Sequence, residues 1–153
     1  MNNTTLTITA DVEEYEVELH GILRIEGFSG TGSGYFNISD VIEFSQKTKD
    51  LAENMEGNAE LVGQLQRTDG SIFLESFIIR VYPLSSSKLN GVVGIHITLG
   101  EYSSSDCREE EKLKVSGEIQ TRNQHLLQFS NDLRMLVMGE IKKVVLDKGV
   151  ETF

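Results

Sequence analysis

The sequence predicts an α+β protein, with a largely antiparallel sheet of about six to seven strands, one helix in the middle of the chain and a long C-terminal helix packed on the sheet. Apolar and polar residues alternate in several segments, as in strands with one buried face. Two other segments repeat apolar residues every three or four positions, as amphipathic helices do. Short turns, and not crossover helices, join the expected strands, which favours antiparallel pairing.

Two strands are expected within residues 5–25, where alternate positions carry apolar side chains. The apolar face consists of Leu6, Ile8, Ala10, Tyr15, Val17, Leu19, Leu23 and Ile25. The opposite face of the second strand carries Glu14, Glu16, Glu18 and His20. Gly21 interrupts this strand and is expected to mark a turn or a bulge.

The glycine-rich segment GTGSG, residues 30–34, is expected to be a flexible connection between two strands. A dinucleotide-binding loop would place its glycines between a strand and the start of a helix, whereas here they lead into the apolar segment YFNI. A P-loop would also need a lysine followed by serine or threonine. The segment therefore does not predict a nucleotide site.

The mid-chain helix is expected from Ser39 or Asp40, either of which can cap it, to about Gly57. Its apolar stripe is Val41, Phe44, Thr48, Leu51 and Met55. The C-terminal helix is expected from Asn123 to a stop at Gly149, with Gly139 as a position that can weaken or divide it. Its apolar stripe is Leu126, Phe129, Leu133, Leu136, Val137, Ile141, Val144 and Val145.

Four further strands are expected between the two helices, in the segments AELVGQL, SIFLESFIIRVY, GVVGIHITL and KLKVSGEIQTR. The second is apolar on both faces in its centre, which predicts a central strand covered on both sides. The third places Val93, Ile95, Ile97 and Leu99 on one side. The last places Leu113, Val115 and Ile119 on its inward face. Asp69-Gly70 and Asn90-Gly91 are the turn signals between these strands.

Length and composition predict one soluble domain over residues 1–153. The first residues, MNNTTLTITADVEE, have neither the basic region nor the apolar run of a signal peptide. The longest apolar runs are too short to cross a bilayer as a helix. The single cysteine, Cys107, excludes an intramolecular disulfide and fits a reducing compartment. We therefore expect a cytoplasmic protein.

The net charge of −10 is concentrated in residues 1–60, which contain 12 acidic and 3 basic residues. Nucleic acids and anionic membranes bind basic surfaces, so neither is expected as a partner. The acidity is compatible with a basic protein partner. It also serves solubility, which is the alternative explanation.

The sequence contains no catalytic or metal-binding pattern, so we expect that the protein is not an enzyme and holds no metal or cofactor. His20, His96 and His125 are isolated from one another and from Cys107, so metal-ligand spacing is missing. The run Ser85-Ser86-Ser87-Lys88 matches the S-x-x-K motif of serine acyl-transfer enzymes. It falls between two expected strands, however, and we interpret it as a polar turn.

Several short segments, taken in order, resemble the immunity proteins of wall-associated and contact-dependent polymorphic toxins, the WapI-type immunity group. The segments are Glu26-Gly27-Phe28-Ser29-Gly30, Val41-Ile42-Glu43-Phe44 with Leu51, then Gly57, Ala59 and Leu61, then Gly91-Val92-Val93-Gly94-Ile95, and finally Gln124 through Leu127 with Phe129. The resemblance implies a bacterial cytoplasmic antidote that binds the C-terminal domain of a cognate toxin and blocks its active site. A nuclease with a basic cleft is the toxin expected from the resemblance.

An acidic surface suits such a partner, because carboxylates can occupy positions meant for phosphates and opposite charges speed association. The first candidate contact surface is Asp11, Glu13, Glu14, Glu16 and Glu18. The second is the loop that carries Asp106, Glu109, Glu110 and Glu111. For both, a solvated face without a partner is the alternative.

A second class of function stays open, a non-enzymatic β-rich domain that binds a small molecule or a sugar between sheet and helices. It requires an apolar cavity with a few convergent polar groups. Exposed edge strands would also allow a homodimer.

Overall fold

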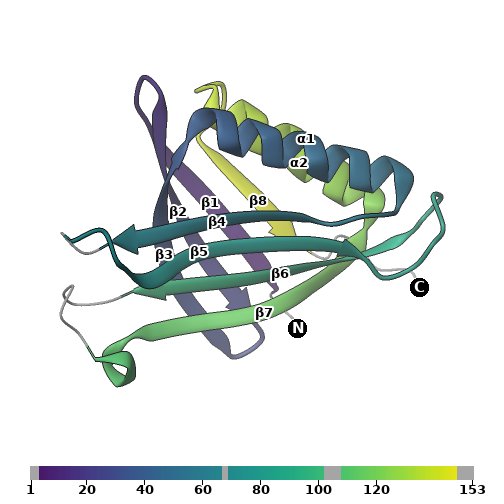
Figure 1. Cartoon of the computed structure of the whole chain (residues 1–153). Helices are drawn as coiled ribbons and strands as arrows, with labels where there is room; N and C mark the ends of the chain where they lie inside the picture. Colours follow the sequence, from purple (N-terminus) through teal and green to yellow (C-terminus); the bar gives the residue numbers. More distant parts are fainter. Residues whose placement is uncertain (1–3, 67–68, 102–107, 148–153) are drawn as a thin grey trace.

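The computed structural model describes residues 4–66, 69–101 and 108–147. Within them the chain forms eight strands, two α-helices and one short 3-10 turn, which confirms the α+β class (Figure 1). In chain order these are β1 (Thr5–Val12), β2 (Glu16–Ile25), β3 (Phe28–Asn37), α1 (Ile38–Asn54), β4 (Ala59–Gln66), β5 (Ile72–Pro83), β6 (Val92–Glu101), η1 (Glu109–Glu111), β7 (Leu113–Arg122), α2 (Asn123–Val137) and β8 (Lys143–Asp147).

The strands form two four-stranded antiparallel sheets, where one sheet of about six to seven strands was expected. Sheet A has the strand order β3-β2-β1-β8, and sheet B has the order β4-β5-β6-β7. The chain leaves sheet A at the end of β3, and α1 carries it to sheet B. Alternation of apolar residues indicates that a strand has one buried face, but it carries no information about which sheet the strand joins.

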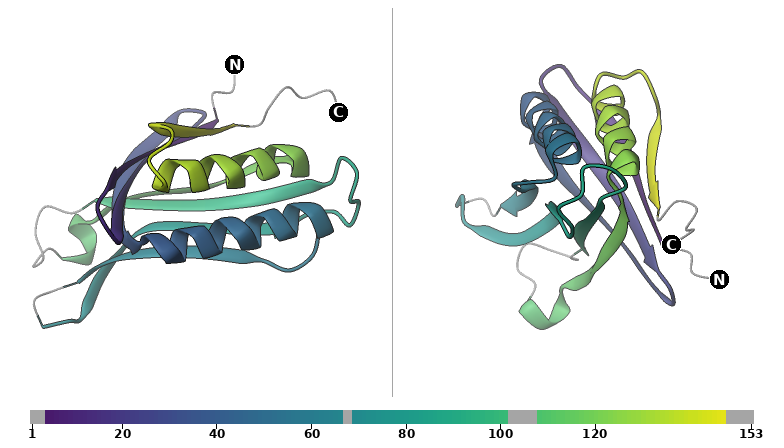
Figure 2. Two further views of the ribbon diagram at one scale, coloured as in Figure 1. Left: turned by 90° about the horizontal axis from the view of Figure 1, so that it is seen from above. Right: turned by 90° about the vertical axis from the view of Figure 1, so that its right-hand side faces the viewer.

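The two sheets cross at a steep angle, and α1 and α2 lie side by side in the space between them (Figure 1, Figure 2). Strand β3 of sheet A packs on sheet B, whereas α2 reaches β1 and β8 of sheet A. Each sheet therefore buries one face and leaves the other face to solvent. The central position predicted for SIFLESFIIRVY is confirmed, because β5 pairs with β4 on one side and with β6 on the other. The predicted cover on both faces is wrong, because Ile78 is only half-buried and Arg80 is exposed on the outer face.

The apolar stripe predicted for α1 is confirmed, because all five of its residues are buried. The helix begins slightly earlier than predicted, with Asn37 at the N-cap in place of Ser39 or Asp40. At the other end Met55 adopts a left-handed conformation with φ 55°, and its N–H donates to the carbonyl of Leu51 at 2.7 Å. This left-handed cap is a common way for a helix to end.

The long C-terminal helix expected from Asn123 to Gly149 is shorter than predicted, because α2 ends at Val137. Gly139 has φ 78°, which ends the helix, and its N–H donates to the carbonyl of Leu136 at 3.1 Å. The chain then forms β8, in which Val144 and Leu146 are buried and Val145 is 47% exposed. The segment KVVLD therefore shows the alternating burial of a strand. The apolar stripe expected for the helix included Val144 and Val145, so the alternation was missed.

The predicted inward face of the first two strands is confirmed except at Tyr15, which is 75% exposed and lies in the connection before β2. The inward face predicted for β6 is confirmed. On β6 the inward residues are Val93, Ile95, Ile97 and Leu99, all fully buried. The prediction for β7 is wrong at one position, because Leu113 is 70% exposed at the start of the strand. Ile119, further along β7, is fully buried as predicted.

The segment GTGSG is not a flexible connection, since it lies inside β3. Its glycines at positions 30, 32 and 34 face sheet B at very short range. A Cβ atom at Gly32 would lie 2.6 Å from the carbonyl oxygen of Ser76 and 2.7 Å from the amide nitrogen of Gly100. A Cβ at Gly34 would lie 3.2 Å from Cα of Gly63. Glycine at these positions lets the β3 backbone approach the backbone of sheet B directly.

Gly21 is likewise neither a turn nor a bulge, because it lies within β2 in unbroken register, opposite Ile8 of β1 and Gly32 of β3. A Cβ there would lie 3.1 Å from side-chain atoms of Leu99 and Phe77. The turn between β2 and β3 is formed by Glu26 and Gly27 instead, since Ile25 pairs with Phe28. The interior glycines of both strands therefore serve packing between the sheets.

Replacing Gly32 by alanine is expected to destabilise the protein by about 3 kcal/mol, because the new methyl group meets backbone atoms that cannot rotate away. Gly27→Ala is the matched control, since nothing lies within 4 Å of a Cβ at that position. The control should change stability by less than about 0.5 kcal/mol. Urea unfolding of the two variants measures the difference. Equal stabilities would contradict the close-approach role of Gly32.

Candidate functional site

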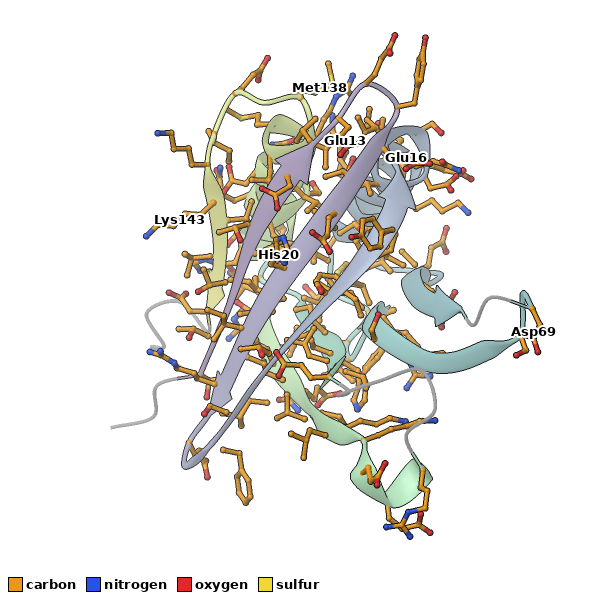
Figure 3. The ribbon with its side chains drawn as sticks, turned by 90° about the vertical axis from the view of Figure 1, so that its left-hand side faces the viewer. Glu13, Glu16, His20, Asp69, Met138 and Lys143 are labelled. Atoms are coloured by element: carbon orange, nitrogen blue, oxygen red, sulfur yellow. The ribbon has the colours of Figure 1, made fainter. Side chains whose placement is uncertain are left out.

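The outer face of sheet A is the face turned away from the helices and from sheet B (Figure 3). The burial pattern of β2 alternates, so Val17, Leu19 and Leu23 point into the core while the residues between them point outward. Figure 3 shows His20 near the centre of this outer face, Glu13 and Glu16 toward the β1–β2 hairpin, and Lys143 on β8 at the side.

The first set of predicted contact residues comes together at the hairpin end of this face. We call Asp11, Glu13, Glu14, Glu16 and Glu18 the acidic face. Pairing of β1 with β2 places Asp11 directly opposite Glu18. The turn is closed by a hydrogen bond from the N–H of Glu13 to the carbonyl of Glu16, at 2.8 Å.

One detail of the predicted row is wrong. Glu14, Glu16 and Glu18 were expected along one strand face, but β2 begins at Glu16 and Glu14 lies in the connection before it. Glu16 and Glu18 share the outer face of β2, and Asp11 joins them from β1. The carboxylates therefore gather from two strands and their turn, which makes the group more compact than a single row.

An open hollow of about 280 Å³ lies within the acidic face. It is lined by Asp11, Glu13, Glu16, Val17, Glu18 and Tyr35. Tyr35 pairs with Glu18 across β2 and β3 and is 59% exposed. An aromatic ring beside several carboxylates provides both apolar contact area and negative charge.

His20 is separated from the other histidines, as expected, but it lies close to two carboxylates. Its Nε2 atom lies 3.0 Å from Oδ2 of Asp11 and 3.2 Å from Oε1 of Glu18. The imidazole is 41% exposed and thus remains accessible at the surface. Sequence spacing missed this group because Asp11 reaches it across the hairpin. The signal that could have found it was the alternation shared by Glu18 and His20, combined with a correct hairpin register.

The second set of predicted contact residues is only partly described, because Asp106 and also Cys107 lie outside the described residues. Glu109–Glu111 form the turn η1. The carboxylate of Glu111 accepts a hydrogen bond from the N–H of Arg108 at 2.9 Å and lies 3.6 Å from its Nε. This turn and the β1–β2 hairpin lie at opposite ends of the molecule (Figure 1, Figure 3). The structure therefore does not bring the two sets together.

The outer face of sheet B carries a second polar group, which the sequence analysis did not predict. The hydroxyl of Tyr82 on β5 donates to the carboxylate of Glu118 on β7, and the side-chain amide of Gln120 donates to the same carboxylate at 2.8 Å. The Tyr82 ring crosses β6 over Gly94, where a Cβ would lie 2.4 Å from the ring. Glycine on the middle strand therefore allows this contact between β5 and β7.

Desolvation raises the pKa of Tyr82 to about 12, and the hydrogen bond to Glu118 adds to the shift. The hydrogen bonds from Tyr82 and Gln120 lower the pKa of Glu118, which therefore stays ionised. A tyrosine that holds its proton this firmly is poorly suited to act as a base or a nucleophile near neutral pH.

The S-x-x-K match adopts the predicted turn between β5 and β6. The hydroxyl of Ser85 accepts a hydrogen bond from the N–H of Val92 at 2.9 Å, and the N–H of Ser85 donates to the carbonyl of Val92 at 3.2 Å. Ser85 thus closes the turn.

Among the described residues, neither α-helix combines the length and apolar character that a membrane crossing requires.

We compared the chain with protein-family models, with curated proteins and with solved structures, and none of the three comparisons found a match.

A pH titration of tyrosine absorbance should contain a step near pH 12, and the Tyr82→Phe variant should lack it. Glu118→Gln should lower the pKa of Tyr82 only in part, because desolvation remains. Since the pKa in the folded state exceeds the ordinary value of 10.0, this group stabilises the fold below pH 10 and loses that contribution as the pH rises toward 12. A titration in which Tyr82→Phe leaves the highest step in place would contradict the assignment.

Proposed function

We propose that this protein is a bacterial immunity protein, which binds a basic toxin domain through the acidic face and so blocks the toxin's active site. The observation that carries the proposal is the convergence of Asp11, Glu13, Glu16 and Glu18 with Tyr35 around one open hollow. The proposal places the protein in the cytoplasm, where a toxin delivered by a neighbouring cell would act. The family resemblance of residues 26 to about 137 supports the same class.

Charge provides the first argument for a basic partner. Carboxylates crowded on one surface raise the local negative potential, which accelerates the approach of a cationic protein. A nuclease cleft is lined with cations that bind phosphates. The acidic face would present oxygen atoms to those cations while the rest of sheet A excludes the substrate.

Tyr35 provides the second argument, because it adds an aromatic contact residue beside the carboxylates. Tyrosine is enriched among the residues that dominate binding energy at protein interfaces, where it combines a large apolar ring with a polar tip. The ring lies on β3 beside Glu18 and borders the hollow. A solvated face that served solubility alone would need no exposed aromatic side chain among its carboxylates.

The acidic face is a better candidate than the turn η1. Asp11, Glu16 and Glu18 lie on strands of sheet A, and the hydrogen bond from Glu13 to Glu16 closes the turn between the strands. This framework holds carboxylates in place before a partner arrives and so reduces the entropy lost on binding. At η1, Glu111 is already engaged by Arg108. We therefore assign the contact surface to the hairpin end of sheet A.

The interior offers little support for the alternative of a small molecule or sugar held between sheet and helices. Within the described residues that space is filled by side chains, among them Phe36 and Phe77, whose rings pack edge to face with centroids 5.6 Å apart. The hollow at the acidic face is an open surface feature, which suits a protein partner better than an enclosed ligand.

The proposal is tested with the C-terminal domain of a large secreted protein encoded beside this gene. Co-purification with this chain and restored growth of cells that express the domain are the expected results. Failure of this chain to restore growth, or the lack of a complex at micromolar concentrations, would contradict the proposal.

Charge reversal locates the surface. Glu13→Lys, Glu14→Lys and Glu16→Lys together should weaken toxin binding at least about tenfold at low salt, mainly through slower association. The loss should shrink as salt rises, because exposed charges are screened over a Debye length of about 10 Å at 0.1 M. The matched control reverses Glu109, Glu110 and Glu111, which changes the net charge equally at the other end of the molecule. A larger loss in the control would move the contact surface to η1.

A further inference from the structure

The described residues contain one cluster in which an imidazole and two carboxylates could hold a metal ion, formed by Asp11, Glu18 and His20. The ligand atoms are Oδ2 of Asp11, Oε1 of Glu18 and Nε2 of His20. All of them lie within 4.8 Å of one another. We propose that this cluster is a binding site for a divalent transition-metal ion of the Zn²⁺ type. This inference concerns only these three residues and does not rest on the proposed function.

The spacing of the ligand atoms fits such an ion. Atoms bound to one Zn²⁺ at about 2.1 Å lie about 3.0 Å apart when their bonds meet at a right angle, and about 3.4 Å apart in a tetrahedron. The distances from Nε2 of His20 are 3.0 Å to Asp11 and 3.2 Å to Glu18. Both values fall in this interval, so an ion could bind with small rotations of the side chains.

Strand pairing holds the ligands in these positions. Asp11 on β1 pairs directly with Glu18 on β2, and His20 follows Glu18 two residues later on the same face. Side chains of directly opposed residues and of diagonal neighbours come within reach of one another on a sheet. The site therefore needs no loop closure to form, and three ligands are present before the metal arrives.

The negative charge around the cluster also favours binding of a cation. Two carboxylates that oppose each other across neighbouring strands repel. Glu13 and Glu16 border the same hollow and increase the negative potential. His20 contributes a positive charge only when protonated, whereas a divalent ion binds its neutral form and offsets both carboxylates. Lys143 is a cation on the same sheet face, but Thr9 of β1 separates it from His20 in the strand register.

The ligand set indicates the class of metal. Ca²⁺ and Mg²⁺ prefer ligand sets made entirely of oxygen, whereas an imidazole nitrogen suits Zn²⁺, Co²⁺, Ni²⁺ and Cu²⁺. Three protein ligands leave at least one coordination position free. The hollow beside the cluster, open to solvent, gives room for water or for a partner's side chain in that position.

Titration of the metal-free protein with Zn²⁺, followed by calorimetry, and with Co²⁺, followed by visible absorption, tests the site. We expect one ion per chain, and at least about tenfold weaker binding in each of the variants His20→Ala, Asp11→Asn and Glu18→Gln. The matched control is His125→Ala, which removes another exposed histidine, on α2, and should leave binding unchanged. Ca²⁺ and Mg²⁺ at equal concentration should not compete.

Two results would overturn the proposal. One is the lack of saturable Zn²⁺ binding by the parent chain. The other is equal binding by His20→Ala and the parent, which would place the ion elsewhere. His20 is partly exposed, so its replacement should leave the core intact. Circular dichroism of the variants checks that they keep the native fold. The titration uses no toxin domain, so failure of the metal site and failure of the proposed function are distinguishable.

Discussion

Direct backbone contact between β3 and sheet B sets the distance between the two sheets. Stacked sheets normally lie about 10 Å apart, because side chains from both fill the space between them. Along β3 the inward positions 30, 32 and 34 have no side chain, and Gly63 of β4 meets Gly34 from the other sheet. The sheets can therefore touch at one region and diverge from it, and α1 and α2 fill the space where they diverge (Figure 2).

The same contact explains why the polar residues of sheet A gather where they do. Once β3 is fixed against sheet B, the alternating pattern of β1 and β2 must turn Leu6, Ile8 and Leu19 inward. A shift of one residue in the hairpin would send these apolar side chains outward and the carboxylates into the core. The packing of the core therefore fixes the register that brings Asp11, Glu18 and His20 together.

Local patterns predicted the class of fold, the α1 stripe, the inward faces of β1, β2 and β6, and the place of β5 in its sheet. They failed where the outcome depends on contacts between distant segments. The sequence around Gly32 looks the same whether this glycine bends a loop or packs against another sheet. Its role depends on the backbone of Ser76 and Gly100, which lie far along the chain. The acidic residues of the hairpin were found from charge alone. Their meeting with His20 was not, because it depends on cross-strand register.

The pairing of β8 with β1 has a consequence for how the protein is made. Strand β1 is the first described strand to leave the ribosome and β8 is the last, yet they are neighbours in sheet A. Until β8 is synthesised, the backbone of β1 from Thr5 to Thr9 has an unpaired edge, which invites pairing with other nascent chains. Sequence-distant pairing of this kind also slows folding. The hairpin of β1 and β2 can form early, but sheet A reaches its full width only after β8 has been synthesised.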